Sequence, residues 1–486
     1  MPKATIKVFD ECNCKIEGLD SSTRKMLVNR FKYEVPGARF MPAVRLGRWD
    51  GKVSFFQMGG KTYINLLPDI IPILEKEGYT LDLEDNRTYS HDIKLIPVDE
   101  YSYEDFIWPE GHPVAGQPVK LRDYQVEVIN GFLQDQQSIQ EVATGAGKTI
   151  ITAVLSHRCE EYGRTLVVVP NKSLVTQTEE DYINMGLDVG VFYGDRKEYD
   201  KTHTICTWQS LGSMMKKTRA KELGFTIDEF ASDVVAVIVD EAHGAKADLL
   251  KELLTGPLAH VPVRWGLTGT IPKEEMDRQS LLIGIGPVTN DVSSKVLQDK
   301  GVLANCHVNI VQMIDIKEYQ NYQSELKYLL ADEDRQDYMA RLINQISDSG
   351  NTLVLIDRVK AGKELTAKIG PDAVFVSGNM KNDKRKEHYD EIKTEDGKVI
   401  VATYGVAAVG INIPRIFNLV LIEPGKSFVR VVQSIGRGVR KAEDKDFVQV
   451  WDITSTAKFA KRHLTQRKKF YKEKSFPFTI EKVDWK

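Results

Sequence analysis

The 486-residue sequence predicts an α/β protein in which two tandem parallel-sheet domains follow a small α+β N-terminal domain. The first observation is that short apolar strands alternate with helical segments from about residue 118 onward. The second is that this series restarts in the C-terminal half, after a switch near residues 285–294. Continuous apolar strands of this kind are typical of parallel sheets that helices cover on both faces.

The N-terminal domain is expected at residues 1–112, up to a linker rich in proline and glycine at residues 108–120. Its predicted elements are strands at 4–10 and 12–18, a helix at 21–34, a hairpin of strands 52–58 and 61–67 around Gly59 and Gly60, and a helix at 67–79. Ser21 or Ser22 is expected to cap the first helix, because a hydroxyl oxygen can accept from a free N–H of the first turn.

The two α/β domains are expected at residues 113–287 and 288–455, with a basic C-terminal helix or tail at 456–486. Their predicted strands are 138–144, 164–170, 202–208, 234–240 and 263–269, then 351–357, 372–378, 398–404, 418–424 and 448–453. The last 29 residues hold ten Lys and Arg against three acids, a net charge of +7. The rest of the chain therefore carries −3 − 7 = −10, so a basic end follows an acidic body.

Composition excludes several classes of protein. Hydrophobic residues make up 42% and charged residues 28%, which rules out a wholly disordered chain. No apolar run approaches 18 residues and the N-terminus lacks a secretory signal, so a cytoplasmic protein without a membrane partner is expected. The five cysteines are scattered and odd in number, which indicates reduced thiols.

The strongest chemical signal is VATGAGKT, at Val142–Thr149, between a predicted strand and a predicted helix. That context is the one a phosphate-binding loop requires. Gly145 and Gly147 let backbone N–H groups approach phosphates, and the helix N-terminus favours an anion. Lys148 would neutralise the β- and γ-phosphates, and the Thr149 hydroxyl would hold Mg²⁺. Val142 stands where such loops usually have their first glycine.

The second signal is VVAVIVDEAH, in which a β-branched run delivers two carboxylates to the end of a buried strand. Carboxylates are expensive near a low-dielectric interior, so their presence there favours a function. In this position Asp240 can hold the Mg²⁺ shell and Glu241 can polarise an attacking water.

Together with LTGT at Leu267–Thr270 and QSIGRGVR at Gln433–Arg440, these motifs resemble the superfamily 2 helicases and translocases. The resemblance covers about residues 118–455. It implies two RecA-like domains, with ATP and Mg²⁺ bound between them. Hydrolysis would then open and close the cleft and drive stepping along one strand.

The resemblance also implies roles for single residues. It assigns catalysis to Lys148, Asp240, Glu241, His243, Gln433, Arg437 and Arg440, and Mg²⁺ binding to Thr149 and Asp240. It assigns nucleotide contacts to Arg122, Gln125, Thr144, Gly145, Ala146, Gly147, Lys148, Thr149, Gly410 and Asn412. Gln125 would read the adenine edge, whereas Asn412 stands where the family more often has Asp. Arg437 and Arg440 share one helix face and would act as an arginine finger, which can contribute roughly 10³ to 10⁵ in rate.

The nucleic-acid contacts that the resemblance implies are mostly contacts to the backbone. They fall at Pro170, Asn171, Lys172, Ser173, Thr176, Gln177, Thr207, Trp208 and Gln209 in the first domain, and at Arg358, Ser377 and Thr403 in the second. Since phosphates dominate such grips, binding is expected to be independent of base sequence and to weaken with salt.

The segment RFMPAVRLGRWDGKVSFF, at Arg39–Phe56, resembles the N-terminal domain of the phage UvsW-type helicases. That resemblance implies unwinding and branch migration of forked or junction DNA in recombination, repair and replication, by a monomer. Arg45, Arg48, Trp49 and Lys52 then form a basic-aromatic cluster suited to a duplex or junction backbone.

Two other interpretations remain open at this stage. One is an RNA-directed DEAH-type helicase, and the other is an ATP-regulated module that binds or anneals DNA without true unwinding. The C-terminal basic helix leaves two readings as well: its aromatic residues stack on bases, or it packs on the protein with a solvated basic face.

Overall fold

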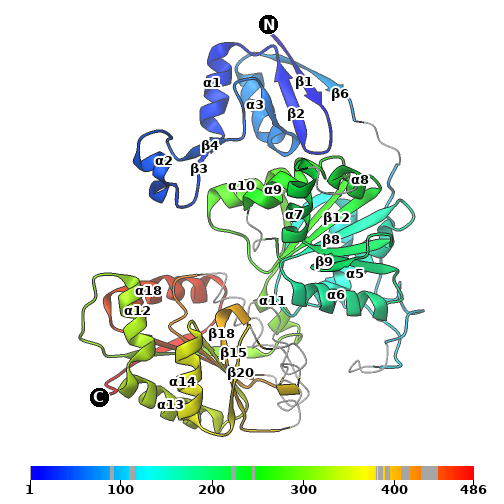
Figure 1. The fold of residues 1–486 in the computed structure, drawn as a ribbon. Helices are drawn as coiled ribbons and strands as arrows, with labels where there is room; N and C mark the ends of the chain where they lie inside the picture. The colour runs from blue at the N-terminus through cyan, green and yellow to red at the C-terminus, as the bar shows by residue number, and fades with distance from the viewer. Residues whose placement is uncertain are drawn as a thin grey trace. The chain divides into compact units, whose positions relative to one another are not determined.

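The computed structural model describes residues 2–87, 92–108, 115–220, 226–242, 247–378, 380, 387–388, 395–406, 415–427 and 447–486. These residues divide into two compact units. The first holds the chain up to residue 142 together with residues 147–291, and the second holds residues 143–146 and 292–486. Figure 1 shows the elements of each unit.

The N-terminal part of the first unit is a four-stranded sheet of order β5-β2-β1-β6, packed on two helices. Its elements are β1 (Lys3–Val8), β2 (Asn13–Glu17), α1 (Ser21–Arg30), β5 (Lys61–Tyr63), α3 (Leu67–Lys76) and β6 (Thr80–Asp85). A small excursion consists of β3 (Lys32–Glu34), η1 (Ala38–Phe40), α2 (Pro42–Arg45) and β4 (Lys52–Ser54), and η2 (Ile64–Leu66) leads into α3.

Two predictions for this part are wrong. Asp20, not a serine, caps α1, because its carboxylate accepts the backbone N–H of Thr23 at 2.8 Å. The expected hairpin does not form either: β4 pairs with β3 and β5 pairs with β2. The glycine turn itself exists, since Gly60 N–H donates to the Gln57 carbonyl at 2.8 Å, but the flanking strands find better partners elsewhere.

The rest of the first unit is an eight-stranded sheet of order β10-β9-β11-β8-β12-β13-β7-β14. Its strands are β7 (Gln137–Val142), β8 (Arg164–Val169), β9 (Val189–Tyr193), β10 (Arg196–Lys197), β11 (His203–Thr207), β12 (Val234–Asp240), β13 (Val263–Thr268) and β14 (Val288–Val292). Its helices are α4 (Asp123–Gln134), α5 (Lys148–Cys159), α6 (Lys172–Asn184), α7 (Trp208–Arg219), α8 (Ile227–Ala231), α9 (Ala247–Leu254) and α10 (Glu275–Gly284).

The N-terminal part is bonded tightly to this sheet domain. Glu11 N–H donates to the Ala259 carbonyl at 2.9 Å, and Asn13 Nδ2 donates to the Thr255 carbonyl at 2.9 Å. Two apolar side chains of α10, Met276 and Ile283, are buried in the N-terminal core. The two parts of the first unit therefore share a hydrophobic core.

The second unit is a seven-stranded sheet of order β17-β18-β16-β19-β20-β15-β21. Its strands are β15 (Asn305–Met313), β16 (Thr352–Ile356), β17 (Ala373–Val376), β18 (Val399–Thr403), β19 (Asn418–Ile422), β20 (Phe447–Ser455) and β21 (Phe478–Val483). Helices among its described residues include α11 (Ser294–Asp299), α12 (Tyr322–Ala331), α13 (Glu333–Ser347), α14 (Val359–Ile369) and α18 (Lys458–Glu473). All six strand pairs in this sheet are parallel, as the apolar runs predict.

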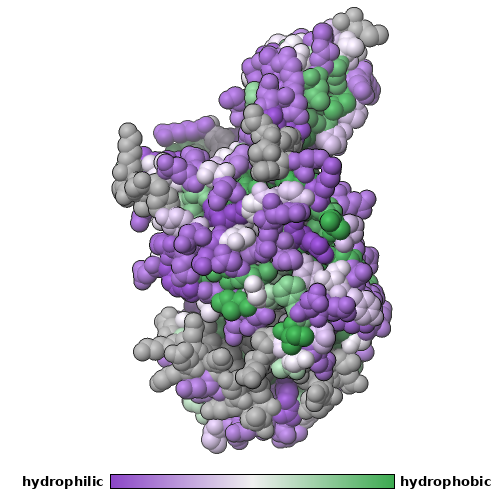
Figure 2. Space-filling view, turned by 90° about the vertical axis from the view of Figure 1, so that its right-hand side faces the viewer, coloured by the Kyte–Doolittle hydropathy of each residue, from purple (hydrophilic) through white to green (hydrophobic). Residues whose placement is uncertain are grey.

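The C-terminal residues complete this sheet domain. β21 pairs with β15 over Val308–Met313, and α18 buries Leu464, Arg467 and Tyr471. Because Tyr471 is fully buried, it is not available to stack on bases, whereas Phe459 and Phe470 are half-buried. The face drawn in Figure 2 is largely hydrophilic, and among the described residues no helix is long and apolar enough to cross a membrane.

Candidate nucleotide and nucleic-acid sites

The predicted motifs of the first unit meet at one edge of its sheet. The phosphate loop follows β7, Asp240 ends β12, and LTGT ends β13, and these strands are neighbours in the parallel sheet. In open parallel sheets, ligands bind at the carboxyl ends of the strands. The topology therefore brings together residues that lie more than a hundred positions apart in sequence.

The loop before α5 needs its glycines. Gly145 has φ +91° and Gly147 has φ +77°, a left-handed conformation that side chains disfavour. A Cβ on Gly147 would also lie 2.7 Å from Gln125 Nε2, so a larger residue there would displace the buried Gln125 amide. Val142, at the position of the usual first glycine, is the fully buried last residue of β7.

A buried ion pair joins the loop to the acidic motif. Lys148 Nζ lies 2.9 Å from Glu241 Oε1, and the two side chains are only 10% and 9% exposed. Glu241 adopts φ +51°, and its N–H donates to Asp240 Oδ1 at 2.9 Å. A non-glycine residue in this region costs of order 1–3 kcal/mol, and such strain is characteristic of functional sites.

One residue of this site was missed from the sequence. Asp181 on α6 shares a side-chain hydrogen bond with Thr149, and burial raises the pKa of the Asp181 carboxyl to about 6. The run TEEDYIN around it reads as a solvated helix face, and only the packing of α6 on α5 brings this carboxyl inward.

Gln125, the proposed adenine contact, lies beside the loop. Its side chain is buried, and its Oε1 accepts the N–H of Arg122 at 2.9 Å, at the start of α4. The Nε2 side of the amide therefore faces Gly147. Arg122 itself donates from Nη1 to the Tyr124 hydroxyl at 3.1 Å.

The residues present fit a nucleoside triphosphate with a divalent cation. The loop offers an ammonium, a helix N-terminus and Thr149, and β12, separated from β7 by β13, offers Asp240. Mg²⁺ commonly takes one or two carboxylate or hydroxyl ligands and completes its shell with phosphate and water. His243, Gly410, Asn412, Gln433, Arg437 and Arg440 lie outside the described residues.

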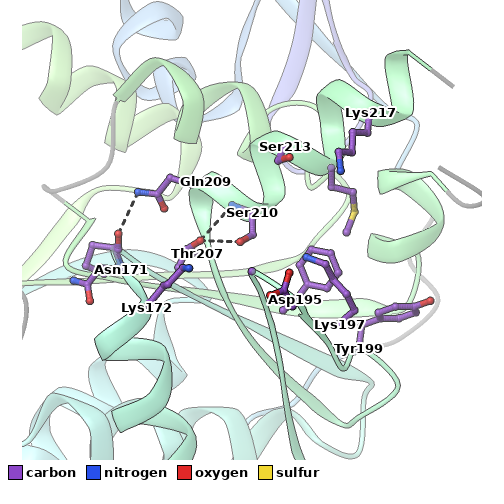
Figure 3. Close-up of a pocket in the computed structure, with 14 residues that line it drawn as sticks. Asn171, Lys172, Asp195, Lys197, Tyr199, Thr207, Gln209, Ser210, Ser213 and Lys217 are labelled. Atoms are coloured by element: carbon purple, nitrogen blue, oxygen red, sulfur yellow. Dashed lines mark hydrogen bonds between the residues drawn. The ribbon is translucent and has the colours of Figure 1, made fainter. Parts of the chain in front are cut away.

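The residues of the first unit that are predicted to contact nucleic acid lie at the ends of β8 and β11. Asn171 caps α6 and Thr207 caps α7, with side-chain oxygens that accept backbone N–H groups. Gln209 Nε2 donates to the Pro170 carbonyl at 3.3 Å and links the two segments (Figure 3). Lys172 is exposed beside them.

The remaining predicted contacts of this segment differ in accessibility. Thr176 is exposed and donates to the Lys172 carbonyl at 3.3 Å, and Gln177 is half-buried. The side chain of Ser173 is not described. The predicted contact of the Trp208 side chain with nucleic acid is wrong. Trp208 is 7% exposed and belongs to the hydrophobic core, so its indole is not available to a bound nucleic-acid strand. Its apolar character, rather than its place in the motif, decides its position.

In the second unit, three predicted contacts share the carboxyl edge of neighbouring strands. Arg358 follows β16, Ser377 follows β17, and Thr403 ends β18, and these strands are adjacent. Arg358 is exposed and donates from Nη2 to Gln323 Oε1 at 2.8 Å.

The N-terminal cluster lies on the excursion around α2. Arg45, Arg48 and Lys52 are exposed, whereas Trp49 is half-buried and donates from Nε1 to the Lys52 carbonyl at 2.9 Å. Sequence reasoning missed two apolar neighbours: Phe40 is 70% exposed and Leu46 is 64% exposed. The guanidinium of Arg39 lies 4.7 Å from the Phe40 ring centroid. The excursion therefore presents apolar tips among basic side chains.

A network of buried charged side chains lies in the second unit, next to the residues that follow β19. Arg467 binds both carboxylate oxygens of Asp452 at 2.8 Å and the Gly425 carbonyl at 2.8 Å. Arg335 Nη2 lies 3.1 Å from Glu423 Oε1, and burial raises the pKa of Glu423 to about 7. Gly425 lies at the start of the chain segment that leads to QSIGRGVR.

Comparisons with known proteins agree with this arrangement. The model of "Type III restriction enzyme, res subunit" matches residues 118–273, and the model of "Helicase conserved C-terminal domain" matches residues 334–442. The ATP-dependent DNA helicase uvsW of Enterobacteria phage T4 is 24% identical over 472 residues, which are 93% of this chain and 90% of that protein. The DNA 3'-5' translocase XPB2 of Sulfurisphaera tokodaii is 27% identical over 298 residues, which are 60% of this chain and 62% of that protein.

A solved structure supports the fold alone. The fragment of a putative HsdR subunit of a type I restriction enzyme from Vibrio vulnificus has a TM-score of 0.58 at 16% identity, and the match covers 97% of this chain and 85% of that one. The predicted fold class, tandem RecA-like parallel-sheet domains after a small α+β domain, is confirmed.

Proposed function

We propose that this chain, an ATP-dependent helicase of superfamily 2 similar to phage UvsW, unwinds and branch-migrates forked or junction DNA. The observation that carries the proposal is the extent of the UvsW match, which covers 93% of the chain and not only the motor. The match to XPB2 covers 60% of the chain. The family models for the helicase motor begin at residue 118.

ATP and Mg²⁺ are the cofactors that the site supports. Lys148 and the N-terminus of α5 would hold the phosphates, with Thr149 and Asp240 on the cation. Bound ATP supplies the phosphoryl group whose transfer to water releases the driving free energy. Glu241 orients that water. In this structure its carboxylate pairs with the Lys148 ammonium, which bound phosphates would also attract. Arg437 and Arg440 remain the proposed finger, and Gln125 the proposed adenine contact.

The proposed preference for branched DNA rests on residues 1–112, which we assign as an accessory DNA-binding domain. The exposed arginines of the α2 excursion suit phosphates, and Phe40 and Leu46 suit unstacked bases at a branch point. Because this domain shares a hydrophobic core with α10, a grip on a junction arm would be held rigidly against the first motor domain. The motor is expected at residues 113–287 and 288–455, although β14 (Val288–Val292) belongs to the first sheet and β21, within 456–486, pairs in the second sheet.

The test is ATP turnover with no nucleic acid, single-stranded DNA, duplex, a fork, a four-way junction and matched RNA, with strand products followed on the fork and junction. We expect the largest stimulation from branched DNA, and junction arms resolved into duplexes. Stimulation of ATP turnover by RNA alone would show that the substrate is RNA and not DNA. Equal turnover on every substrate, including none, would overturn the nucleic-acid part of the proposal. A sedimentation measurement under the same conditions tests the expected monomer.

A further inference from the structure

A cavity of about 960 Å³ opens in the first unit, beside the segments that are proposed to grip the strand. Pro170, Asn171 and Lys172 form one side of it, together with Thr207 and Gln209 (Figure 3). The other side comes from the β9–β10 turn and from the later turns of α7, at Ser213, Met214 and Lys217, where the resemblance assigns no contact. The cavity is therefore continuous with the proposed strand path but extends beyond it.

Two lysines of the far side form no ion pair among the described residues. Lys197 reaches the cavity from β10 and Lys217 from the last turn of α7. In the part of the chain that the structure describes, neither forms an ion pair. By contrast, the adjacent Arg196 binds Glu179 at 2.6 Å and Glu198 at 2.8 Å, and Lys201 binds Asp188 at 2.9 Å. Arg196 and Lys201 are therefore paired with carboxylates, whereas Lys197 and Lys217 form no ion pair among the described residues.

The two lysines also disfavour each other. Partial burial and the positive charge of Lys217 lower the pKa of Lys197, against an opposing effect of Asp195. Lys197 Nζ lies 4.3 Å from the Phe192 ring centroid, so its ammonium is held over an apolar surface. An anion between the two lysines would relieve this repulsion. With Lys172, the lining carries three lysines against one aspartate.

The same cavity has an apolar wall. Phe192 and Met214 are buried beneath it, and Tyr199 is 37% exposed at its rim. The Tyr199 ring makes edge contacts with Phe192 at 6.2 Å and with Phe230 at 5.9 Å between centroids, which fix its orientation. A fixed and exposed aromatic ring is a sequence-tolerant stacking partner for a base.

We propose that this cavity is a subsite for one unpaired nucleotide of the bound strand, with its phosphates between Lys197 and Lys217 and its base against Tyr199. The inference rests on the proposed function and adds a site that distinguishes single-stranded from duplex DNA. A base inside a duplex is paired and stacked, so only a strand that is already single, or a base released at a branch, can enter. Sites of a few hundred to about 1,000 Å³ enclose ligands of nucleotide size.

The first test compares dissociation constants for a single strand and for a blunt duplex of equal length, at fixed salt. Removal of a stacked base contact costs about 1–3 kcal/mol, so Tyr199→Ala should weaken single-strand binding about 5- to 150-fold and leave duplex binding within about twofold. Tyr199→Phe should retain the affinity, because the ring remains. The paired neighbour provides the control for the lysines: Lys197→Ala with Lys217→Ala should weaken binding of the strand, and Lys201→Ala should not.

The second test walks one abasic site along the single strand. We expect one position at which loss of the base weakens binding to the natural protein but not further to Tyr199→Ala, because both remove the same contact. Additive losses at every position would overturn the base assignment. Equal weakening of strand and duplex would reduce the cavity to a backbone contact and also overturn it.

The outcomes separate this inference from the proposed function. If the natural protein shows no DNA-stimulated ATP turnover, the proposed function fails. If stimulation is normal but Tyr199→Ala binds single strand and duplex as the natural protein does, only the subsite fails. Thymidine monophosphate serves as the probe for a free nucleotide: binding that depends on Tyr199, without any change in strand affinity, would assign the cavity to a mononucleotide instead.

Discussion

The two units each bury an ion pair, and the two pairs are built differently. In the first unit, Lys148 and Glu241 meet through one contact of 2.9 Å, with Glu241 in a strained left-handed conformation. In the second, Arg467 holds Asp452 through two contacts of 2.8 Å, and both side chains are fully buried. Tyr471 donates a further hydrogen bond to Asp452 at 2.7 Å.

The difference indicates that the Lys148–Glu241 ion pair can be exchanged for contacts with a ligand, whereas the Arg467–Asp452 ion pair stays intact. A single contact at a loop can be replaced when phosphates compete for the ammonium. A bidentate pair with its remaining groups satisfied compensates the cost of burying both charges, and it leaves no position for a ligand. The first pair is therefore expected to govern turnover, and the second to govern the stability of the C-terminal segment and of the loop at Gly425.

The largest effect is expected for Lys148→Ala. ATP turnover should fall at least about 10³-fold, because the charge that holds the phosphates is lost, while affinity for DNA at fixed salt stays within about threefold. Turnover assays and anisotropy titrations measure the two quantities, with Lys172→Ala as the inverse control that weakens DNA binding. A folded Lys148→Ala protein that no longer binds DNA would contradict the separation of the two sites.

Next comes Arg467→Met, which leaves the Asp452 carboxylate buried without its cation. The free energy of unfolding should fall by about 3–5 kcal/mol, measured by denaturant titration. Lys469→Met, an exposed change on the same helix, should alter it by less than about 0.5 kcal/mol. A loss of turnover without any loss of stability in Arg467→Met would assign this pair to chemistry and break the comparison.

A smaller effect is expected for Tyr471→Phe. Only the hydrogen bond to Asp452 is removed, and a bond to a charged acceptor contributes about 1.5–3 kcal/mol to stability. The same titration gives the value. No change in the unfolding midpoint would indicate that the two contacts from Arg467 already satisfy the carboxylate.

A further effect concerns the dependence of stability on pH. Burial raises the pKa of Glu423 from about 4.5 to about 7, with Arg335 and Arg467 lowering it and Asp452 raising it. The folded state therefore binds a proton more readily than the unfolded state, so this group contributes stability below pH 4.5 that is lost as pH rises through 7. Glu423→Gln should flatten the fall in unfolding free energy between these values. An unchanged slope would show that another group carries it.

The sequence by itself determined the central strands and the chemistry at their ends. Runs such as RTLVVVP and VVAVIVD are buried on both faces, so local composition alone specifies β8 and β12. The phosphate loop was equally predictable from the sequence, because its glycines and Lys148 lie within eight consecutive residues. Local patterns suffice wherever the cause of the structure is local.

The edge strands and the extra site residues were decided by tertiary structure. β6 and β21 are largely exposed and carry no apolar run, and they exist because β1 and β15 offer parallel backbone partners. Asp181 reaches Thr149 only through helix packing, and Lys197 meets Lys217 only because β10 and α7 converge. These contacts join residues that are distant in sequence, and no periodicity within either segment encodes the other. Their existence therefore followed from the fold, and not from the pattern of either segment.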